Sequence, residues 1–387
     1  MSALASTSAP RAVASRSFAR ATSPRVARCR AHHRRSRADA VDRRVSLARS
    51  AASDASSAAA SASPADDDEV ELAGDIEIPE RPTHVRAVDG FLPAADAASL
   101  RKVFDDHHDD PRRTHEYRFV WDYWHVPGQY TLLRTPAADY FPEAQYRELE
   151  SALLTFAREQ LGCAGITPVW LSCYVDGCRQ ELHADVPHGP WAFVLSLTDW
   201  KARKFTGGET LILKPETLDY WRGFDVDAVV ERGSLVRLVE PEFNRLTVFD
   251  PRLPHGVPVV EGVRDPREGR LVIHGWFNDP EPHFTGGLTA AEAEPVLMDV
   301  LPPLYETLGQ LPRARGVVAV RAHVRPDGTV ERTEYTADSL VPAPGGEDAD
   351  PTEIRDAIML EIAGTLMDAK FPAAKEPSVI TLPVVFD

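Results

Sequence analysis

The sequence after Gly162 is dominated by short runs of β-forming residues that glycine and proline separate. Six such runs are VWLSCYV (169–175), WAFVLSLT (191–198), ETLILKP (209–215), SLVRLVEP (234–241), RLTVFD (245–250) and RLVIHGWF (270–277). Several short strands with turn signals between them are typical of all-β sandwiches and barrels. We therefore predict a mainly β fold for this part of the chain.

Helices are predicted to flank these strands. Residues 88–104 indicate a strand that leads into a helix, because apolar residues recur on one helical face. A second helix is expected from Pro142 to Leu161, with Gly162 supplying its left-handed stop. The predicted fold class is therefore mainly β with flanking helices.

Composition and pattern divide the chain into five segments. We expect a targeting segment at 1–50, a low-complexity Ala/Ser and acidic linker at 51–80, the β-rich domain at 81–285, a helical connector at 286–312 and a small α+β domain at 313–387. The last segment is interpreted as a hairpin over 315–336, a helix over 351–369 and a closing strand, with Pro-Asp-Gly at 326–328 as the hairpin turn.

Charge is distributed unevenly along the chain. The chain has 43 basic and 59 acidic residues, for a net charge of −16. Residues 1–50 contain 12 of the basic and 2 of the acidic residues, so the rest of the chain carries a net charge of about −26. The Ser, Ala and Arg richness of residues 1–50 is typical of an organelle transit peptide, which favours the chloroplast stroma, with the mitochondrion as second choice. A disordered basic tail that binds RNA or acidic partners is the alternative interpretation.

The same patterns argue against several classes of function. Because residues 51–387 are strongly acidic, they should repel phosphate backbones, and no nucleic-acid partner is expected. No apolar run approaches the roughly 18 residues needed to cross a bilayer, so no membrane span is expected. The sequence also contains no G-x-G-x-x-G, G-x-x-x-x-G-K-[ST], G-x-S-x-G or H-E-x-x-H, which removes the simplest nucleotide-binding, hydrolase and zincin interpretations.

Three residues form a candidate metal site. His183 and Asp185 are two positions apart, so on an extended chain both side chains project from one face. His255 lies seventy residues after Asp185, just beyond the predicted strand 245–250. Two imidazoles and one carboxylate leave coordination positions open, which suits an Fe(II) ion that must bind a bidentate co-substrate together with O₂.

A cation is also expected for the carboxylate of such a co-substrate. Arg270 opens the strand that follows His255, and a guanidinium matches a carboxylate in a two-point fork. Arg264 and Arg267 are rival candidates in the same connection. We favour Arg270 because a residue at the start of that strand can point into the barrel mouth.

These motifs together resemble the Fe(II)/2-oxoglutarate oxygenase superfamily, particularly its prolyl-hydroxylase-like branch. The resemblance covers roughly residues 85–285. It is carried by the H-x-D at 183–185 after a strand bearing Tyr174, by FTGGET at 205–210, by PHGV at 254–257 and by RLVIHGWF at 270–277.

The resemblance implies a double-stranded β-helix (jelly roll), with Fe(II) as the metal and 2-oxoglutarate and O₂ as co-substrates. Ascorbate is a further expected cofactor. By motif position, His183, Asp185 and His255 would be the iron ligands and Arg270 would anchor 2-oxoglutarate. Tyr174 would be a candidate for a hydrogen bond to it. The expected activity is hydroxylation of a protein or peptide side chain or of a small metabolite.

Neighbouring residues receive more modest interpretations. His274 is expected to be a packing residue or to support the ligands, and His188 to lie in the core, on the surface or at the substrate mouth. FTGGET is interpreted as a tight hairpin whose glycines allow close backbone approach.

The segment 313–387 resembles the C-terminal domain of the TonB/AgmX type, through its V-x-V-R-x-x-V-x-x-D-G-x-V-E pattern and terminal VITLPVVFD. It carries no cluster with ligand spacing, so a protein-interaction module or a packing appendage is expected. Two alternatives to the oxygenase hypothesis stay open. One is a cupin-like protein that binds another divalent metal, and the other is a catalytically silent scaffold.

Overall fold

The computed structural model describes residues 82–109, 121–185, 188–215, 217, 230–343 and 350–386. All of them fall within one compact unit, Gly74–Asp387. The predicted targeting segment (1–50) and linker (51–80) lie outside the described residues. The location in the chloroplast and the domain boundaries therefore stay predictions.

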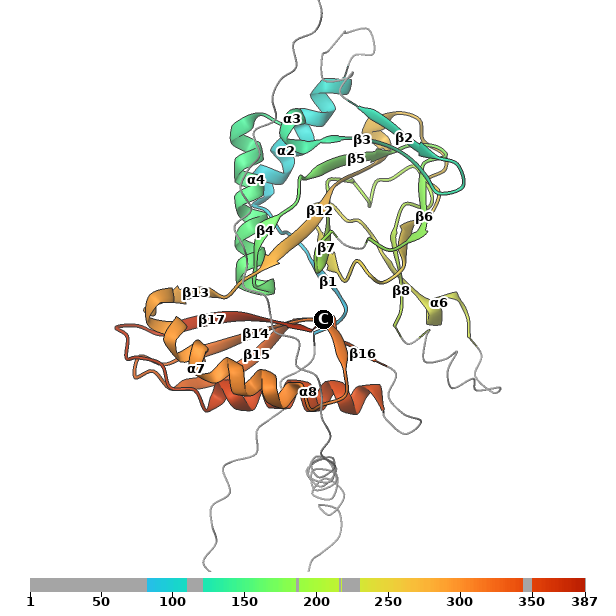
Figure 1. Ribbon diagram of the computed structural model, residues 1–387. Helices are drawn as coiled ribbons and strands as arrows, with labels where there is room; N and C mark the ends of the chain where they lie inside the picture. Colours follow the sequence, from blue (N-terminus) through green and yellow to red (C-terminus); the bar gives the residue numbers. More distant parts are fainter. Residues whose placement is uncertain are drawn as a thin grey trace, which may run out of the picture. The chain divides into compact units, whose positions relative to one another are not determined.

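The first and larger sheet is built from twelve strands (Figure 1). They are β1 (Val85–Val88), β2 (Asp122–Val126), β3 (Tyr130–Pro136), β4 (Cys163–Ile166), β5 (Trp170–Tyr174), β6 (Arg179–His183), β7 (Trp191–Ser196), β8 (Thr210–Leu213), β9 (Val236–Val239), β10 (Leu246–Phe249), β11 (His255–Val257) and β12 (Arg270–Pro280). The helical segments are α2 (Ala94–His108), α3 (Ala137–Tyr140), α4 (Glu143–Phe156), η3 (Ala157–Leu161), α6 (Arg232–Leu235), η4 (Pro266–Glu268), α7 (Ala290–Leu308) and α8 (Pro351–Met367).

Eight of these strands form the two walls of a jelly roll. One wall has the order β10-β7-β12-β5 and the other has the order β6-β11-β8-β9. The consecutive pairs β5–β6, β7–β8, β9–β10 and β11–β12 each place one strand in each wall, and all the pairings are antiparallel. This alternation defines the double-stranded β-helix that the sequence predicted. Strand β3 pairs with both β5 and β6, so it joins the walls along one side.

Side-chain alternation separates the outside of the jelly roll from its interior. Leu171 and Cys173 of β5 point outward into a hydrophobic cluster with Leu153 of α4, while Tyr174 belongs to an inner cluster that also contains Val272 of β12. Helices α2 and α4 cover the outer face (Figure 1). Both predicted flanking helices are confirmed, and Gly162 ends the second with φ 61°.

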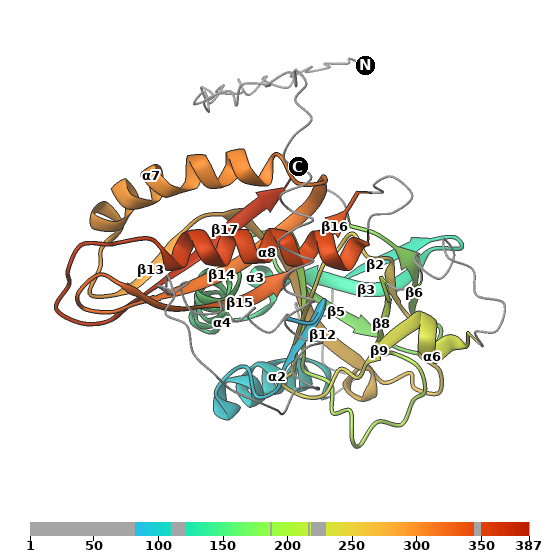
Figure 2. The ribbon, with the colours of Figure 1, turned by 90° about the horizontal axis from the view of Figure 1, so that it is seen from below.

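A second sheet follows in the order β13-β17-β14-β15, with β16 paired to β14. Its strands are β13 (His283–Gly286), β14 (Ala314–Val324), β15 (Val330–Asp338), β16 (Val341–Pro342) and β17 (Ser378–Phe386). Helices α7 and α8 lie side by side against one face of it (Figure 2). The hairpin, helix and closing strand predicted for 313–387 are confirmed, and the sheet gains β13 from the chain that precedes α7.

The other face of this second sheet shares a core with the jelly roll. Val317 and Ala319 of β14 and Ala337 of β15 belong to the same buried cluster as the helices that cover the first sheet. The Thr381 hydroxyl donates a hydrogen bond to the Glu159 carbonyl oxygen over 3.0 Å. The two sheets therefore pack as one body.

The FTGGET segment packs against the chain that follows β11. Gly207 and Gly208 have φ values of 74° and 83°, and the Gly208 amide donates to the Pro258 carbonyl oxygen over 3.2 Å. Thr206 forms a bridge with Glu261. The predicted close approach is confirmed, but the predicted local hairpin is wrong, because the segment pairs with residues that lie 50 to 55 positions later.

Replacing Gly207 with alanine is expected to lower the free energy of unfolding by about 3–5 kcal/mol. A Cβ atom there would lie 1.9 Å from the Val259 carbonyl oxygen and would need a left-handed backbone. Gly90→Ala is the matched control, because Gly90 has φ 63° but has no atom within 4 Å of an added Cβ. It should cost only about 1–2 kcal/mol. Equal midpoint shifts of the two variants in urea would contradict this account.

Candidate metal centre

The pairing of β6 with β11 brings the predicted ligands together. His255 is the cross-strand partner of His183, and their ring centroids lie 4.4 Å apart. Asp185 follows β6 by two residues, and its amide donates to the Pro251 carbonyl oxygen over 2.9 Å. The loop that leads into His255 is therefore tied to the loop that carries Asp185.

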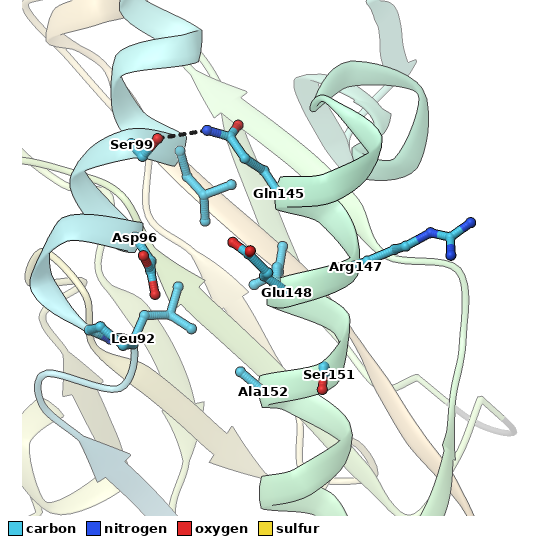
Figure 3. Close-up of a pocket in the computed structure, with 11 residues that line it drawn as sticks. Leu92, Asp96, Ser99, Gln145, Arg147, Glu148, Ser151 and Ala152 are labelled. Atoms are coloured by element: carbon cyan, nitrogen blue, oxygen red, sulfur yellow. Dashed lines mark hydrogen bonds between the residues drawn. The ribbon is translucent and has the colours of Figure 1, made fainter.

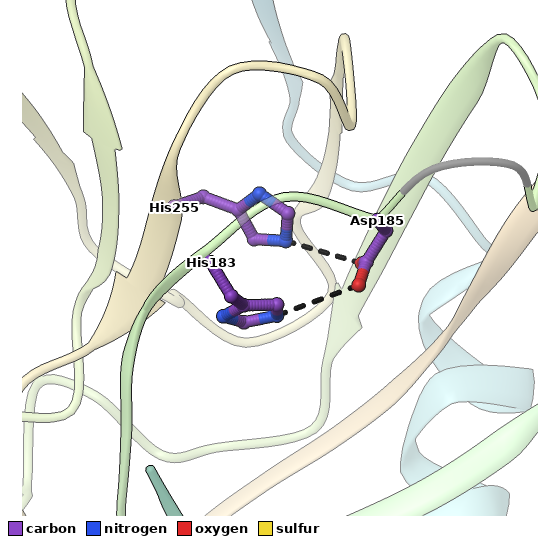
Figure 4. Close-up of side chains that lie close together, drawn as sticks. All are labelled: His183, Asp185 and His255. Carbon is purple, nitrogen blue, oxygen red and sulfur yellow. Dashed lines mark hydrogen bonds and ion pairs between the residues drawn. The ribbon is translucent and has the colours of Figure 1, made fainter.

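The three side chains converge on one point (Figure 4). Their potential ligand atoms all lie within 4.8 Å of one another. Oδ2 of Asp185 is 3.2 Å from Nε2 of His255, and Oδ1 is 3.5 Å from Nε2 of His183. Within the described ranges, no other group of His, Cys, Asp or Glu meets the same criterion.

Hydrogen bonds to the backbone indicate which ring nitrogen carries the proton in both imidazoles. Nδ1 of His183 lies 2.8 Å from the Glu181 carbonyl oxygen, and Nδ1 of His255 lies 2.9 Å from the Leu253 carbonyl oxygen. A ring nitrogen that faces a carbonyl oxygen carries the proton, which leaves Nε2 as an acceptor in the neutral ring. Both Nε2 atoms point toward Asp185, so three acceptors meet without a donor between them.

Electrostatics at this point favour a bound cation. Burial and the neighbouring His255 imidazole lower the pKa of His183, so its neutral form is favoured. Burial alone would raise the pKa of Asp185, but its interactions with His255 and His183 hold that pKa below its usual value, so the side chain is a carboxylate. A carboxylate and two neutral imidazoles form the donor set that suits Fe(II), with positions left for other ligands.

Arg270 lies on the inner face of the same barrel. It is 1% exposed, its Cζ is 4.6 Å from the centre of the Tyr174 ring, and its Nη2 donates to the Thr210 hydroxyl over 3.3 Å. Its Nε and Nη1 make no hydrogen bond within the described residues. Burial lowers the pKa of Arg270, and the Tyr174 side chain partly offsets that effect. A buried guanidinium with unsatisfied donors indicates an anion supplied from outside the chain.

Strand β8 connects Arg270 to the histidine–aspartate group. Thr210 and Ile212 lie two positions apart on β8 and are both buried, so they share its inner face. Arg270 reaches Thr210, while His255 is the cross-strand partner of Ile212. The guanidinium and the metal ligands thus occupy neighbouring positions along one interior wall.

The rival arginines point elsewhere. The Arg264 side chain is 92% exposed and lies 3.9 Å from Asp176. Arg267 forms an ion pair with Asp265 at 2.7 Å. The structure therefore favours Arg270 over both.

Tyr174 and His274 also line the interior. The Tyr174 hydroxyl donates to Oε1 of Gln180 over 2.8 Å, and burial raises its pKa to about 12. Nε2 of His274 lies 2.8 Å from the Ser172 hydroxyl, and burial lowers its pKa to about 4, so the ring is neutral at ordinary pH. His274 interacts electrostatically with Asp185 and His183, which fits its predicted supporting place.

His188 lies at the surface, with its ring tilted against that of Trp276. The two centroids are 4.5 Å apart, with 30° between the ring planes. His188 is exposed and interacts electrostatically with Asp185. A position at the mouth of the barrel, one of the places considered for it, fits these contacts.

Sequence reasoning missed three residues of the β2–β3 hairpin that reach this region. The Tyr130 ring meets His183 edge-on at 5.2 Å and stacks on Trp124 at 4.9 Å. Arg134 in turn lies over Trp124. The Pro127–Gly128 turn between two runs rich in aromatic residues could have indicated the hairpin. The position of β3 in the sheet, however, depends on its pairing with two distant strands.

A hollow of about 530 Å³ lies apart from this centre, between α2 and α4 (Figure 3). Its lining includes Leu92, Ser99 and Gln145, and the Gln145 amide donates to the Ser99 hydroxyl over 2.6 Å. None of the predicted site residues lines it. It is therefore not the metal centre.

Comparison with known proteins gives a family match over the site. Residues 169–278 match the family model of the 2OG-Fe(II) oxygenase superfamily, and this segment contains His183, Asp185, His255 and Arg270. A search of curated proteins finds no match. None of the helices described in the structure is both long and apolar enough to cross a bilayer.

Solved structures similar to the chain include two prolyl hydroxylases. One is from Trichoplax adhaerens, in complex with a hypoxia inducible factor peptide fragment, at 15% identity and a TM-score of 0.36, over 50% of this chain and 84% of that chain. The other is a Pseudomonas putida prolyl-4-hydroxylase, at 18% identity and a TM-score of 0.34, over 50% of this chain and 92% of that chain. HygX from Streptomyces hygroscopicus, with nickel and 2-oxoglutarate bound, has 13% identity and a TM-score of 0.35, over 50% and 82%.

Proposed function

We propose that this chain is an Fe(II)- and 2-oxoglutarate-dependent dioxygenase that hydroxylates a protein side chain or a small metabolite. One observation carries the proposal. A group of three converging acceptors and a buried guanidinium with unsatisfied donors line the interior of one jelly roll. The first requires a cation, the second requires an anion, and 2-oxoglutarate bound to iron meets both requirements.

Each residue has a distinct task in this proposal. His183, Asp185 and His255 would hold the iron, and their backbone hydrogen bonds fix the orientation of both rings before metal binds. Arg270 would bind the distal carboxylate of 2-oxoglutarate and so orient it. Fe(II) in this class of enzyme supplies the O₂-dependent oxidation of a substrate C–H bond, coupled to conversion of 2-oxoglutarate to succinate and CO₂.

The inner cluster would keep bulk water from the reacting groups. Tyr174, whose ring lies against Arg270, belongs to a cluster of buried apolar side chains that includes Leu132, Val257 and Val272. In such a setting the charge of Arg270 acts at low effective dielectric, which strengthens its interaction with a carboxylate. The interior is thus suited to bind a dianion in one orientation.

Anaerobic addition of Fe(II) and 2-oxoglutarate is expected to produce a weak visible absorption band, which Zn(II) in place of Fe(II) does not give. Aerobic incubation with ascorbate should then yield succinate in the absence of any substrate. Metal binding without the band would favour a cupin-like metal-binding protein. No metal binding at all would favour a catalytically silent scaffold.

A non-catalytic role is proposed for the second sheet and its helices, as an interaction module or as a packing support. Two observations support this assignment. Its described residues contain no metal-ligand group, and one of its faces packs against the jelly roll.

A further inference from the structure

A second arginine, Arg134, lies over two tryptophan rings. Its Cζ lies 3.9 Å from the centroid of Trp124 and 4.6 Å from that of Trp170. Strands β2, β3 and β5 supply these three residues. Two aromatic faces fix the plane of the guanidinium and favour its positive charge.

Only one ion pair competes for this guanidinium within the described residues. Nε of Arg134 lies 3.3 Å from Oδ2 of Asp122, whose side chain is 59% exposed. Its Nη1 and Nη2 make no hydrogen bond in the described part of the chain. An ion pair with so exposed a carboxylate is weak. It does not explain why two tryptophans hold the arginine flat.

Two series of contacts link the arginine to the proposed iron site. It is the cross-strand partner of Ser172, whose hydroxyl meets His274. His274 interacts electrostatically with both Arg134 and His183. Within the hairpin, the Trp124 ring stacks on the Tyr130 ring, and the Tyr130 ring contacts His183 edge-on. The Arg134 side chain is 23% exposed, whereas Arg270 is buried deeper in the barrel, so Arg134 lies nearer to solvent.

We propose that Arg134 binds a carboxylate of the substrate, and so selects an anionic substrate for oxidation at the neighbouring metal centre. This inference rests on the proposed function, because it assumes that 2-oxoglutarate occupies Arg270. A planar guanidinium whose two terminal nitrogens make no hydrogen bond to the described residues suits a planar carboxylate. That group can belong to a free organic acid or to an acidic side chain of a peptide, and the two sources are separated by the probes below.

The test uses the full chain loaded with Mn(II) and saturated with 2-oxoglutarate, and the line widths of probe protons in NMR spectra. Mn(II) broadens the signals of molecules that bind near it. The first pair of probes is hippurate and its neutral amide, hippuramide. The second pair is the capped peptide Gly-Gly-Glu-Gly-Gly and its glutamine counterpart. Broadening of hippurate alone identifies a free acid as the substrate class, and broadening of the glutamate peptide identifies an acidic side chain.

In the unmodified protein, at least one acid probe should bind roughly tenfold more tightly than its neutral partner. Arg134→Gln should remove that preference and leave the anaerobic Fe(II)–2-oxoglutarate band unchanged, so a failure here differs from a failure of the proposed function. Arg147→Gln is the control, because the Arg147 side chain is 73% exposed on α4. Acid and neutral probes that behave alike in the unmodified protein, or a preference that survives in Arg134→Gln, overturn the inference.

A second variant keeps the test decisive if Arg134→Gln does not fold. Asp122→Asn removes the carboxylate that competes for Nε of Arg134 but keeps the aromatic clamp. It should strengthen binding of the preferred acid probe by roughly two- to fivefold. Weaker or unchanged binding of that probe contradicts the proposal.

Discussion

Replacement of Asp185 by alanine is expected to reduce the substrate-independent formation of succinate at least about a hundredfold. Asp185 supplies the only carboxylate of the converging group, and its two oxygens face one histidine each. The variant leaves two neutral imidazoles, which hold Fe(II) poorly without a charged oxygen ligand. Succinate measured by mass spectrometry, with Fe(II), 2-oxoglutarate and ascorbate supplied in excess, checks the result.

The control separates loss of a ligand from loss of fold. Asp139→Ala removes an exposed carboxylate from α3 and should leave succinate formation unchanged. The hydrogen bond from the Asp185 amide to Pro251 involves only backbone atoms, so it survives the substitution. Substantial succinate formation by a folded Asp185→Ala variant would remove Asp185 from the proposed ligand set.

Replacement of Arg270 by methionine is expected to have opposite effects on stability and on binding. Without co-substrate, the variant should be more stable by about 1–3 kcal/mol, because it removes a buried charge that has unsatisfied donors. The KM for 2-oxoglutarate should rise roughly a hundredfold, because the charged partner of its distal carboxylate is gone. Arg270→Lys should fall between these results, since a lysine lacks the two-point fork.

Thermal unfolding with and without 2-oxoglutarate distinguishes the two effects. In the Mn(II)-loaded protein, 2-oxoglutarate at a hundred times its Kd should stabilise the unmodified chain by about 2.7 kcal/mol, and the same concentration should stabilise Arg270→Met far less. Arg264→Met serves as control, because its side chain is 92% exposed. A variant that is destabilised without co-substrate and keeps its KM would show that Arg270 serves the fold alone.

Much of the candidate site could be predicted from local sequence. The spacing of His183 and Asp185 on an extended chain fixes their common face, and the turn before His255 places that residue at the start of a strand. The position of Arg270 at the start of β12 likewise follows from the β-forming run behind it. These features depend on a few neighbouring residues, so the local sequence pattern predicts them.

The missed features depend on pairings between distant segments. Strand β3 lies between β5 and β6, and no local pattern in residues 130–136 specifies two partners that lie 34 to 50 positions later. The contacts that link Arg134 to the metal centre follow from that pairing. For the same reason β13 joins the second sheet through β17, about a hundred residues away. In both cases the strand's partners are determined by long-range packing and not by local β propensity.

The shared core between the two sheets has a practical consequence for shortening the chain. A fragment that ends before α7 would lose Val317, Ala319 and Ala337 from the buried cluster and so leave an apolar patch in water. It would also remove the hydrogen bond that Arg252, three residues before His255, donates to the Ser339 carbonyl oxygen over 2.6 Å, and leave Arg252 only its ion pair with Asp250. A truncated chain would thus be prone to aggregate and would hold the loop before His255 by fewer contacts, so engineering should begin from both sheets together.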